Sequence, residues 1–272
     1  MALSILNNIS ALQAENQLNV TTASANKSLQ QLSSGSRINS GSDDAAGLSI
    51  SDGLNANVSA LTQSSENATN AVGSLQTADG ALAQVTTLLN RSITLATEAS
   101  NTGLSTAQST AINSEFQALM TQINNISVST NFNGTPLFGS TISAFTSDGT
   151  SSGTVTIGTT VSSVDSTSLG LGSAALSTSD SAQSALTLIS TAIAQVAQDR
   201  GTLGATVEQL QAASTVDTDQ SQNLTSASSA ITSADISSVV ASDTKYSILE
   251  QTGISALQQA NQQAENVLKL IQ

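Results

Sequence analysis

The chain contains no cysteine and no histidine. Without cysteine it forms no disulfide bond, carries no thiolate nucleophile and offers no cysteine-based metal site. Without histidine it also lacks the commonest metal ligand and general base of proteins. An enzyme built on this chain would have to work with carboxylates, lysine or hydroxyl groups alone. The composition therefore argues against catalysis and against a cofactor.

Aromatic and charged residues are scarce as well. Aromatic residues make up 2% of the 272 positions, and charged residues make up 9%, against about 25% in a typical soluble protein. Ala, Ser, Thr, Asn and Gln fill most of the remaining positions. Such side chains pack along narrow seams between helices, but they cannot fill a wide core.

The charges that are present are mostly acidic, with a formal net charge of −13. Binding to nucleic acid or to an anionic membrane depends on clustered Lys and Arg, of which the chain has six. No apolar run approaches the roughly 18 residues of a membrane span, and the start, MALSILNN, lacks the features of a secretory signal. We therefore expect no nucleic-acid partner, no membrane insertion and no cleaved signal peptide.

The clearest periodic pattern runs through residues 54–96. Alternate steps of four and three residues define a heptad seam in which most positions are apolar. The seam consists of Leu54, Val58, Leu61, Ser65, Ala68, Val72, Leu75, Asp79, Leu82, Thr86, Leu89, Ile93 and Ala96. Its polar members Asp79 and Thr86 either fix the register of the helix or lie at the solvent-exposed edge of the seam. On this register Leu75 is a core residue, whereas replacing Ser64, which lies beside the seam, should matter little.

Similar spacing predicts further helices around residues 112–126, from about residue 181 onwards, and in both chain ends. The segment 131–136, NFNGTP, ends the second of these helices with an Asn-Gly turn and the only proline. Residues 137–180 differ in character, because TVTIGTTV alternates like a strand and Asp148-Gly149 is a typical hairpin corner. The fold class is therefore mostly α, with long antiparallel helices in coiled-coil or bundle packing and one small β-hairpin region.

The two chain ends are poor in both charge and large apolar side chains. Their few aliphatic residues bury too little surface to offset the entropy lost on ordering. We expect residues 1 to about 35 and about 240 to 272 to be disordered in the free monomer. They should become helical when other chains pack against them.

The segment 32–50, LSSGSRINSGSDDAAGLSI, combines three glycines with a rare cation, Arg37, and two carboxylates, Asp43 and Asp44. A phosphate-binding loop would end in Gly-Lys-Ser/Thr, which is absent here. A calcium loop would need about five or six oxygen ligands in a short span. A joint between two helices fits better, because serines and aspartates favour a helix start. We expect Arg37 to pair with Asp43, with Asp44 or with an acidic residue of a neighbouring subunit.

The same segment closely resembles the N-terminal signature of bacterial flagellins, in its Ser-Gly-x-Arg-Ile-Asn core and its Asp-Asp-Ala-Ala-Gly-Leu run. Other segments resemble this family in the same order along the chain. They are LATEASN (95–101), INNISVSTNFNGTPLF (123–138), LGATVEQL (203–210) and ILEQTGISALQQANQQAENVLKLIQ (248–272). The chain resembles a minimal flagellin that has only the core domains and lacks the large variable outer domains.

The resemblance implies an architecture and a function. Residues 1–42 and 236–272 would form the two halves of an inner terminal coiled coil. Residues 43–235 would form a helical core domain with the β-hairpin region at about 137–180. The implied function is that of the structural subunit of the extracellular flagellar filament, which serves motility. The alternative is a hook–filament junction protein or a flagellin-like adhesin, present in few copies.

The resemblance also implies partners and sites. The partners would be other copies of the chain, the export chaperone of a type III pathway, hook-associated and cap proteins, and the vertebrate Toll-like flagellin receptor. The joint would consist of Arg37, Asn39, Asp43 and Asp44, and the receptor contact surface of Arg91, Leu95 and Glu115. Family members that this receptor detects usually carry a second Arg and a Glu where this chain has Ile93 and Thr94. The chaperone and inner-core segment would use Ile254, Leu257, Ala264, Val267, Leu268, Leu270 and Ile271.

Overall fold

A computed structural model of the chain describes residues 8–150 and 153–271. The chain divides into two compact units, which are described separately. Unit 1 comprises Met1–Asn55 and Leu224–Gln272, and unit 2 comprises Ala56–Asn223. Within the described residues no helix is long and apolar enough to cross a membrane.

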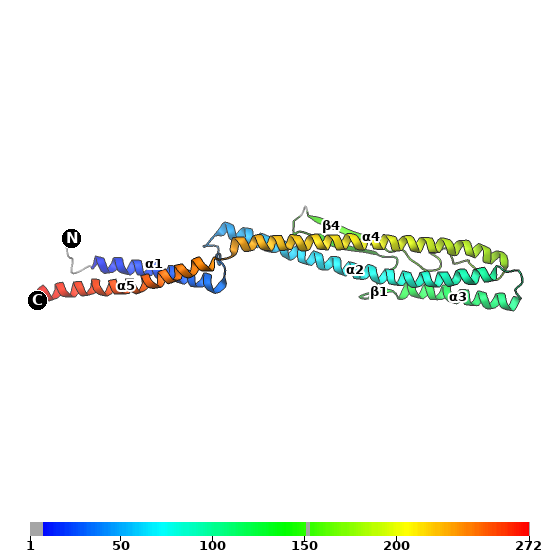
Figure 1. Cartoon of the computed structure of the whole chain (residues 1–272), viewed down its shortest axis with the longest axis horizontal. Coiled ribbons are helices and arrows are strands. Elements are labelled where there is room, and N and C mark those ends of the chain that lie inside the picture. The colour runs from blue at the N-terminus through cyan, green and yellow to red at the C-terminus, as the bar shows by residue number, and fades with distance from the viewer. Residues whose placement is uncertain (1–7, 151–152, 272) are drawn as a thin grey trace. The chain divides into compact units, whose positions relative to one another are not determined.

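Unit 1 is built on a pair of helices, α1 (Ile9–Ser34) and α5 (Ile236–Ile271), which lie side by side (Figure 1). The start of α1 is capped by Asn8, whose side chain accepts a hydrogen bond from the backbone N–H of Ala11 and donates one to the carbonyl of Ala260. The helix ends at Gly35 in the left-handed conformation, with φ of 67°, which favours glycine at a C-cap.

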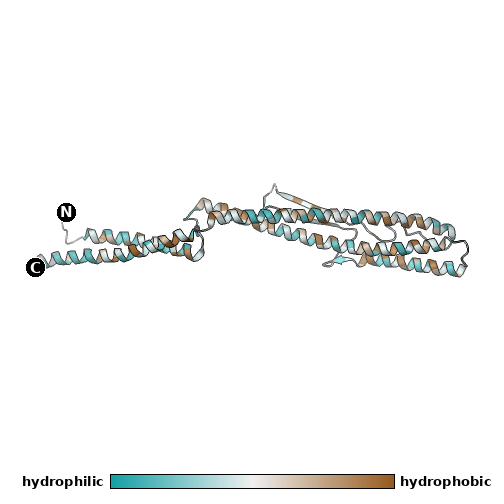
Figure 2. Ribbon diagram, viewed as in Figure 1, coloured by the Kyte–Doolittle hydropathy of each residue, from teal (hydrophilic) through white to brown (hydrophobic). Residues whose placement is uncertain are grey.

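The interface between α1 and α5 is narrow. The buried residues of α1 are the small side chains Thr21, Ala25 and Ser28. Larger apolar residues of both helices remain exposed, among them Val20 and Ile248. Figure 2 shows hydrophilic residues interspersed with hydrophobic ones along both helices. Pairing α1 with α5 therefore leaves much apolar surface in contact with water.

Unit 2 contains most of α2 (Ala45–Ala99) and α4 (Ser179–Thr232) together with α3 (Thr106–Ser129), and the three helices run side by side (Figure 1). Large side chains such as Phe116 are fully buried in a continuous core between them. The helix α3 begins with a capping box, in which Ser105 and Gln108 satisfy each other's backbone N–H groups.

The seam of α2 is partly as predicted. Leu61, Ala68, Leu75, Leu82, Leu89 and Ala96 are all buried. The alternate positions of the prediction are wrong by one residue, because the buried residues are the ones just before them, Ser64, Ala71, Ala78, Val85 and Ser92. The prediction stepped by four and then by three residues from each of the confirmed positions, whereas the burial follows steps of three and then four.

The two polar members of the predicted seam lie at its edge, half-buried. The carboxylate of Asp79 accepts hydrogen bonds from Arg200 of α4, at 2.7 Å and 3.2 Å, and this contact raises the pKa of Arg200. The hydroxyl of Thr86 donates to the carbonyl of Leu82 in its own helix. Asp79 therefore links α2 to α4, whereas Thr86 does not.

Two small antiparallel hairpins complete unit 2. The first pairs β1 (Asn131–Phe132) with β2 (Thr135–Pro136) around Asn133 and Gly134, both with positive φ as the turn residues predict. The second pairs β3 (Thr141–Ser147) with β4 (Thr154–Thr160) in a register that joins Thr141 to Thr160. The corner begins at Asp148-Gly149, as predicted. The predicted fold class is therefore confirmed.

Ser64 fastens the second hairpin to α2. Its hydroxyl oxygen accepts a hydrogen bond from the backbone N–H of Ser147, at 2.7 Å, and its hydroxyl donates to the carbonyl of the same residue, at 2.9 Å. One turn further along, the amide of Asn67 donates to the carbonyl of Phe145. The prediction that Ser64 has little structural importance is therefore wrong.

Candidate functional site

The segment 35–47 is a joint, and the structure ties it to the segment 231–235 at the other end of the chain. The two segments form an antiparallel bridge between Ser36 and Ser233. The N–H of Arg37 donates to the carbonyl of Thr232, at 2.7 Å, and the N–H of Ala234 donates to the carbonyl of Gly35, at 3.0 Å. The turn after α1 and the turn before α5 therefore hold each other in place.

Arg37 contributes its side chain to this junction as well as its backbone. Its Nη2 donates a hydrogen bond to the carbonyl of Ile231, at 2.8 Å. This carbonyl lies in the last turn of α4, where carbonyl groups lack helical partners and a positive charge is favourable. The prediction of an ion pair with Asp43 or Asp44 in the same chain is therefore wrong, and the neighbouring-subunit alternative stays a prediction.

Asp43 instead pairs with Lys27 of α1, with 2.8 Å between Nζ and Oδ1. Its other carboxylate oxygen accepts hydrogen bonds from the backbone N–H groups of Asn39 and Ser40 and from the hydroxyl of Ser40. The hydrogen bond from Lys27 is the largest cause, and together these contacts lower the pKa of Asp43 to about 2. Asp43 therefore organises the loop and fixes it to α1.

The two other predicted joint residues also act locally. The side-chain amide of Asn39 donates to the carbonyl of Ser36, and Oδ1 of Asp44 accepts from the N–H of Gly47. A Cβ at Gly47 would lie 2.5 Å from Oδ2 of Asp44 and 2.7 Å from the buried Ile38. Any side chain at position 47 would therefore displace the Asp44 carboxylate or the Ile38 side chain, which favours glycine at this position.

Sequence reasoning missed three participants in the joint. Lys27 lies sixteen positions before Asp43, inside the predicted helix, and nothing local connects the two residues. Ser36 and Thr232 act together through a hydrogen bond of 3.0 Å from the serine hydroxyl to the threonine carbonyl. Contacts between residues so far apart in sequence leave no pattern in a single sequence.

Two of the three predicted receptor residues form an exposed ion pair. The guanidinium of Arg91 donates twice to Oε1 of Glu115, with a shortest distance of 2.6 Å. Leu95, by contrast, is only 1% exposed and belongs to the core. The expectation that Leu95 contributes to a contact surface is therefore wrong, because its position on α2 turns it inward.

The C-terminal candidates lie on α5. Ile254 is 45% exposed, whereas Leu257 and Ala264 are half-buried against the remainder of unit 1. The side chains of Val267, Leu268, Leu270 and Ile271 lie outside the described residues.

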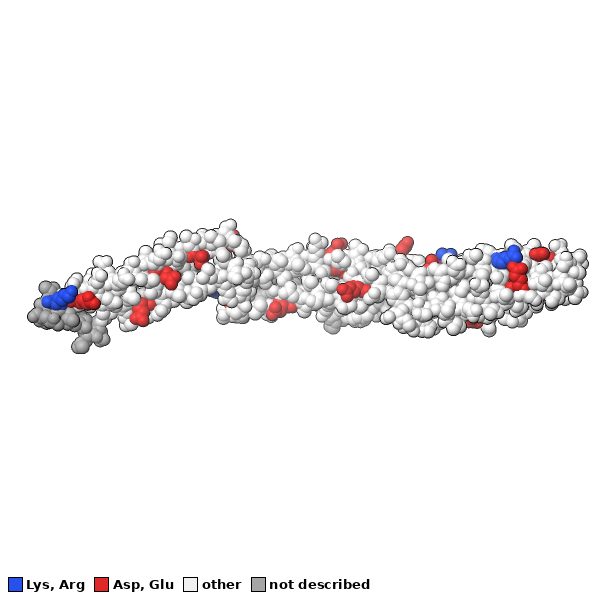
Figure 3. Space-filling view, turned by 90° about the horizontal axis from the view of Figure 1, so that it is seen from below, with Lys and Arg blue, Asp and Glu red and all other residues white. Residues whose placement is uncertain are grey.

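Charged side chains are sparse on the molecular surface. Figure 3 shows them as scattered spots on a largely uncharged face. In the part of the chain that the structure describes, no three acidic residues gather where they could hold a metal ion. Asp43 is engaged by Lys27, and Asp217 lies half-buried on α4.

Comparisons with known proteins match both halves of the chain to one family. Residues 5–142 match the bacterial flagellin N-terminal helical region, and residues 186–271 match the bacterial flagellin C-terminal helical region. The flagellin of Halalkalibacterium halodurans is 34% identical, over 98% of this chain and 99% of that protein. The flagellin of Bacillus subtilis is 31% identical, over 98% and 99% respectively. The crystal structure of Bacillus cereus flagellin covers 60% of this chain and 94% of its own, with 28% identity and a TM-score of 0.49.

Proposed function

We infer from the membership of this chain in the bacterial flagellin family that it is a structural subunit of the extracellular flagellar filament. The family consists of structural proteins whose members polymerise with copies of themselves. The observation that carries this function is likeness to flagellins along almost the whole chain, including both helical ends. The junction-protein and adhesin alternative has no comparable support.

Polymerisation also suits the exposed apolar surface of unit 1. Burial of such surface is favourable by about 25 cal/mol per Å², and copies of the chain can provide that burial. The test is to add short filament fragments to the purified chain and follow growth by electron microscopy. Filaments of indefinite length support the function, whereas capped oligomers of fixed size would support a junction protein.

The joint is the part of the molecule that we assign to assembly. Arg37 is exposed beside a polar cleft of about 380 Å³ between α1 and α5, and its guanidinium bonds a neutral carbonyl. We propose that it also donates hydrogen bonds to a carboxylate of a neighbouring subunit, with Asn39, Asp43 and Asp44 holding the loop in place. Arg37→Ala should raise the critical concentration of polymerisation up to about tenfold, and Arg37→Lys less. An unchanged critical concentration in both variants would remove this role.

The finer partners follow from the family in the same way. We propose export through a type III pathway without a cleaved signal peptide, a chaperone on the C-terminal segment, and hook-associated and cap proteins at the filament ends. Ile254, which is exposed on α5, lies within the proposed chaperone segment. Isothermal titration of the chain with the flagellar export chaperone of its own source tests the chaperone proposal. The full chain should bind the chaperone, and deletion of residues 250–272 should abolish that binding.

Recognition by the vertebrate Toll-like flagellin receptor is proposed through Arg91 and Glu115. Both are exposed, and together they form one polar feature that spans α2 and α3. A receptor contact must either share this ion pair or replace it. Binding that is equal for the wild type and for Arg91→Ala would contradict this surface.

A further inference from the structure

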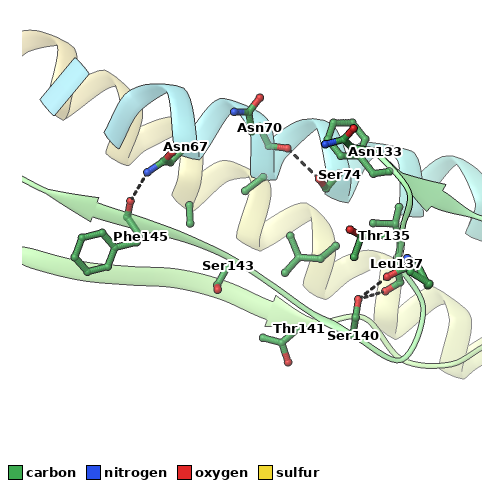
Figure 4. Close-up of a pocket in the computed structure, with 15 residues that line it drawn as sticks. Asn67, Asn70, Ser74, Asn133, Thr135, Leu137, Ser140, Thr141, Ser143 and Phe145 are labelled. Carbon is green, nitrogen blue, oxygen red and sulfur yellow. Dashed lines mark hydrogen bonds between the residues drawn. The ribbon is translucent and has the colours of Figure 1, made fainter. Parts of the chain in front are cut away.

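A groove of about 1050 Å³ lies in unit 2 between α2 and β3 (Figure 4). Its lining mixes amide and hydroxyl side chains, such as those of Asn70 and Ser74, with apolar side chains, such as those of Ile142 and Phe132. Its lining includes no charged residue. In a chain with a net charge of −13, such a surface is one where another acidic chain can approach without repulsion.

One wall of the groove is the free edge of a sheet. The sheet has two strands, so β3 pairs with β4 on one side only. On the other side, the carbonyl of Phe145 and both backbone groups of Ser147 bond to side chains of α2. Because backbone groups alternate in direction along an antiparallel strand, Thr141 and Ser143 point their N–H and C=O groups the same way.

At Thr141 and Ser143, however, α2 supplies no such bond among the described residues. The hairpin is fastened to α2 near its corner, by Ser64 and Asn67, and the groove lies along the remainder of β3. Figure 4 shows Asn67 bonded to Phe145 at one end of this space, with Ser143 and Thr141 further along the strand. The groove therefore presents unpaired edge groups to the solvent.

We propose that an extended segment of a second copy of this chain enters this groove and adds a third strand to the edge of β3. This inference rests on the proposed function, since it assumes that copies associate. An added strand uses backbone hydrogen bonds for affinity and alternate side chains for specificity. Three or four residues, at about 3.3 Å each, match the free length between Thr141 and Phe145. The uncharged lining selects an uncharged segment, which is abundant in a chain with 9% charged residues.

Proline provides the decisive variant, because it removes one backbone donor and is tolerated only where that donor is not part of a ladder. In Ser143→Pro the lost N–H faces the groove, so the pairing of β3 with β4 should survive. Ser143→Ala removes the hydroxyl and keeps the N–H, and it serves as the matched control. We expect Ser143→Pro to melt close to the wild type and to raise the critical concentration of polymerisation about three- to tenfold. Ser143→Ala should polymerise normally.

Amide hydrogen exchange of the wild type gives a second, independent measurement. The N–H groups of Thr141, Ser143 and Phe145 should exchange rapidly in the monomer and slowly in the polymer, after the polymer is dissolved for residue-level analysis. Protection in the polymer supports strand addition, and it decides the matter should Ser143→Pro fail to fold. Equally rapid exchange in both states, or polymerisation of a folded Ser143→Pro at the normal critical concentration, would overturn the inference. A wild-type chain that forms no polymer at all would instead contradict the proposed function.

Discussion

Both units pack helices through small side chains, but they differ in how many large apolar side chains they bury. In unit 2, α2 is covered by α3, α4 and a hairpin, so that leucines and a phenylalanine are buried together with the small residues. In unit 1 the helices α1 and α5 lie against each other, and no third helix or strand of the described residues packs against either to a similar extent. Most exposed large apolar residues accordingly belong to unit 1: Ile9, Leu12, Val20, Leu29, Leu32, Ile50, Ile236, Val240, Ile248, Leu249 and Ile254.

A heptad-like pattern therefore fixes which face of a helix is buried but does not by itself supply enough buried surface. A third element against the same face converts a seam into a core, as in unit 2. Without a third element, the apolar side chains stay exposed until another chain covers them. We therefore expect unit 2 to fold alone and unit 1 to be completed by assembly.

The largest expected contrast concerns local stability in the free monomer. Amides of α1 and α5 should exchange with little protection, because their pairing buries mostly small side chains. Amides in the core of unit 2 should be protected by a factor of about 10³ or more, as befits a stable domain. Hydrogen exchange of dilute monomer measures both at once. Strong protection of α1 and α5 would show that unit 1 is stable without other subunits.

Two truncations, one in each unit, test this division of roles. Leu75→Ala removes a side chain that is fully buried in unit 2, and should lower the free energy of unfolding by about 2–5 kcal/mol. Val20→Ala truncates a side chain of α1 that is 61% exposed, and should leave monomer unfolding unchanged while weakening polymerisation. Denaturant unfolding and the critical concentration provide the two measurements. A monomer destabilised equally by both changes would contradict the division of roles.

A smaller loss is expected at Ser64. Ser64→Ala leaves the N–H and C=O of Ser147 without their partner on α2, at a cost of about 1–3 kcal/mol. Ser74→Ala is the control, because that hydroxyl bonds only the carbonyl of Asn70 in its own helix. Thermal unfolding of the two variants should separate them. Identical melting would mean that the hairpin does not depend on this fastening.

The helices, the position of the hairpin and the joint could all be predicted from the sequence. Their signals are local: heptad spacing, the turn at Asn133-Gly134, and the clustered glycines and aspartates of the joint. The pairing partners could not be predicted. Asp43 with Lys27, and Arg37 with Ile231, depend on how distant segments meet. Ser64 was missed for a related reason, since a polar residue on a buried face gains its importance from a strand eighty-three positions away.

The smallest expected effect depends on pH and concerns Asp217 of α4. Its Oδ2 is buried and has no hydrogen-bond partner within the described residues, and desolvation raises its pKa above the usual 3.8. The folded protein therefore holds this proton more tightly than the unfolded chain does, so that this group favours folding increasingly as pH falls through its folded pKa. Asp217→Asn removes the charge at every pH. It should raise the melting temperature of unit 2 by at most about 2 °C at pH 7, and the gain should shrink as pH falls toward 4.

Asp219→Asn is the matched control, because this exposed aspartate lies two positions further along the same helix. It removes the same formal charge without relieving a buried carboxylate, so the two variants separate desolvation from the general effect of a chain with net charge −13. Thermal unfolding of both variants at pH 7 and pH 4 makes the comparison. An equal gain from both substitutions would mean that long-range repulsion, and not the burial of Asp217, limits the stability of α4.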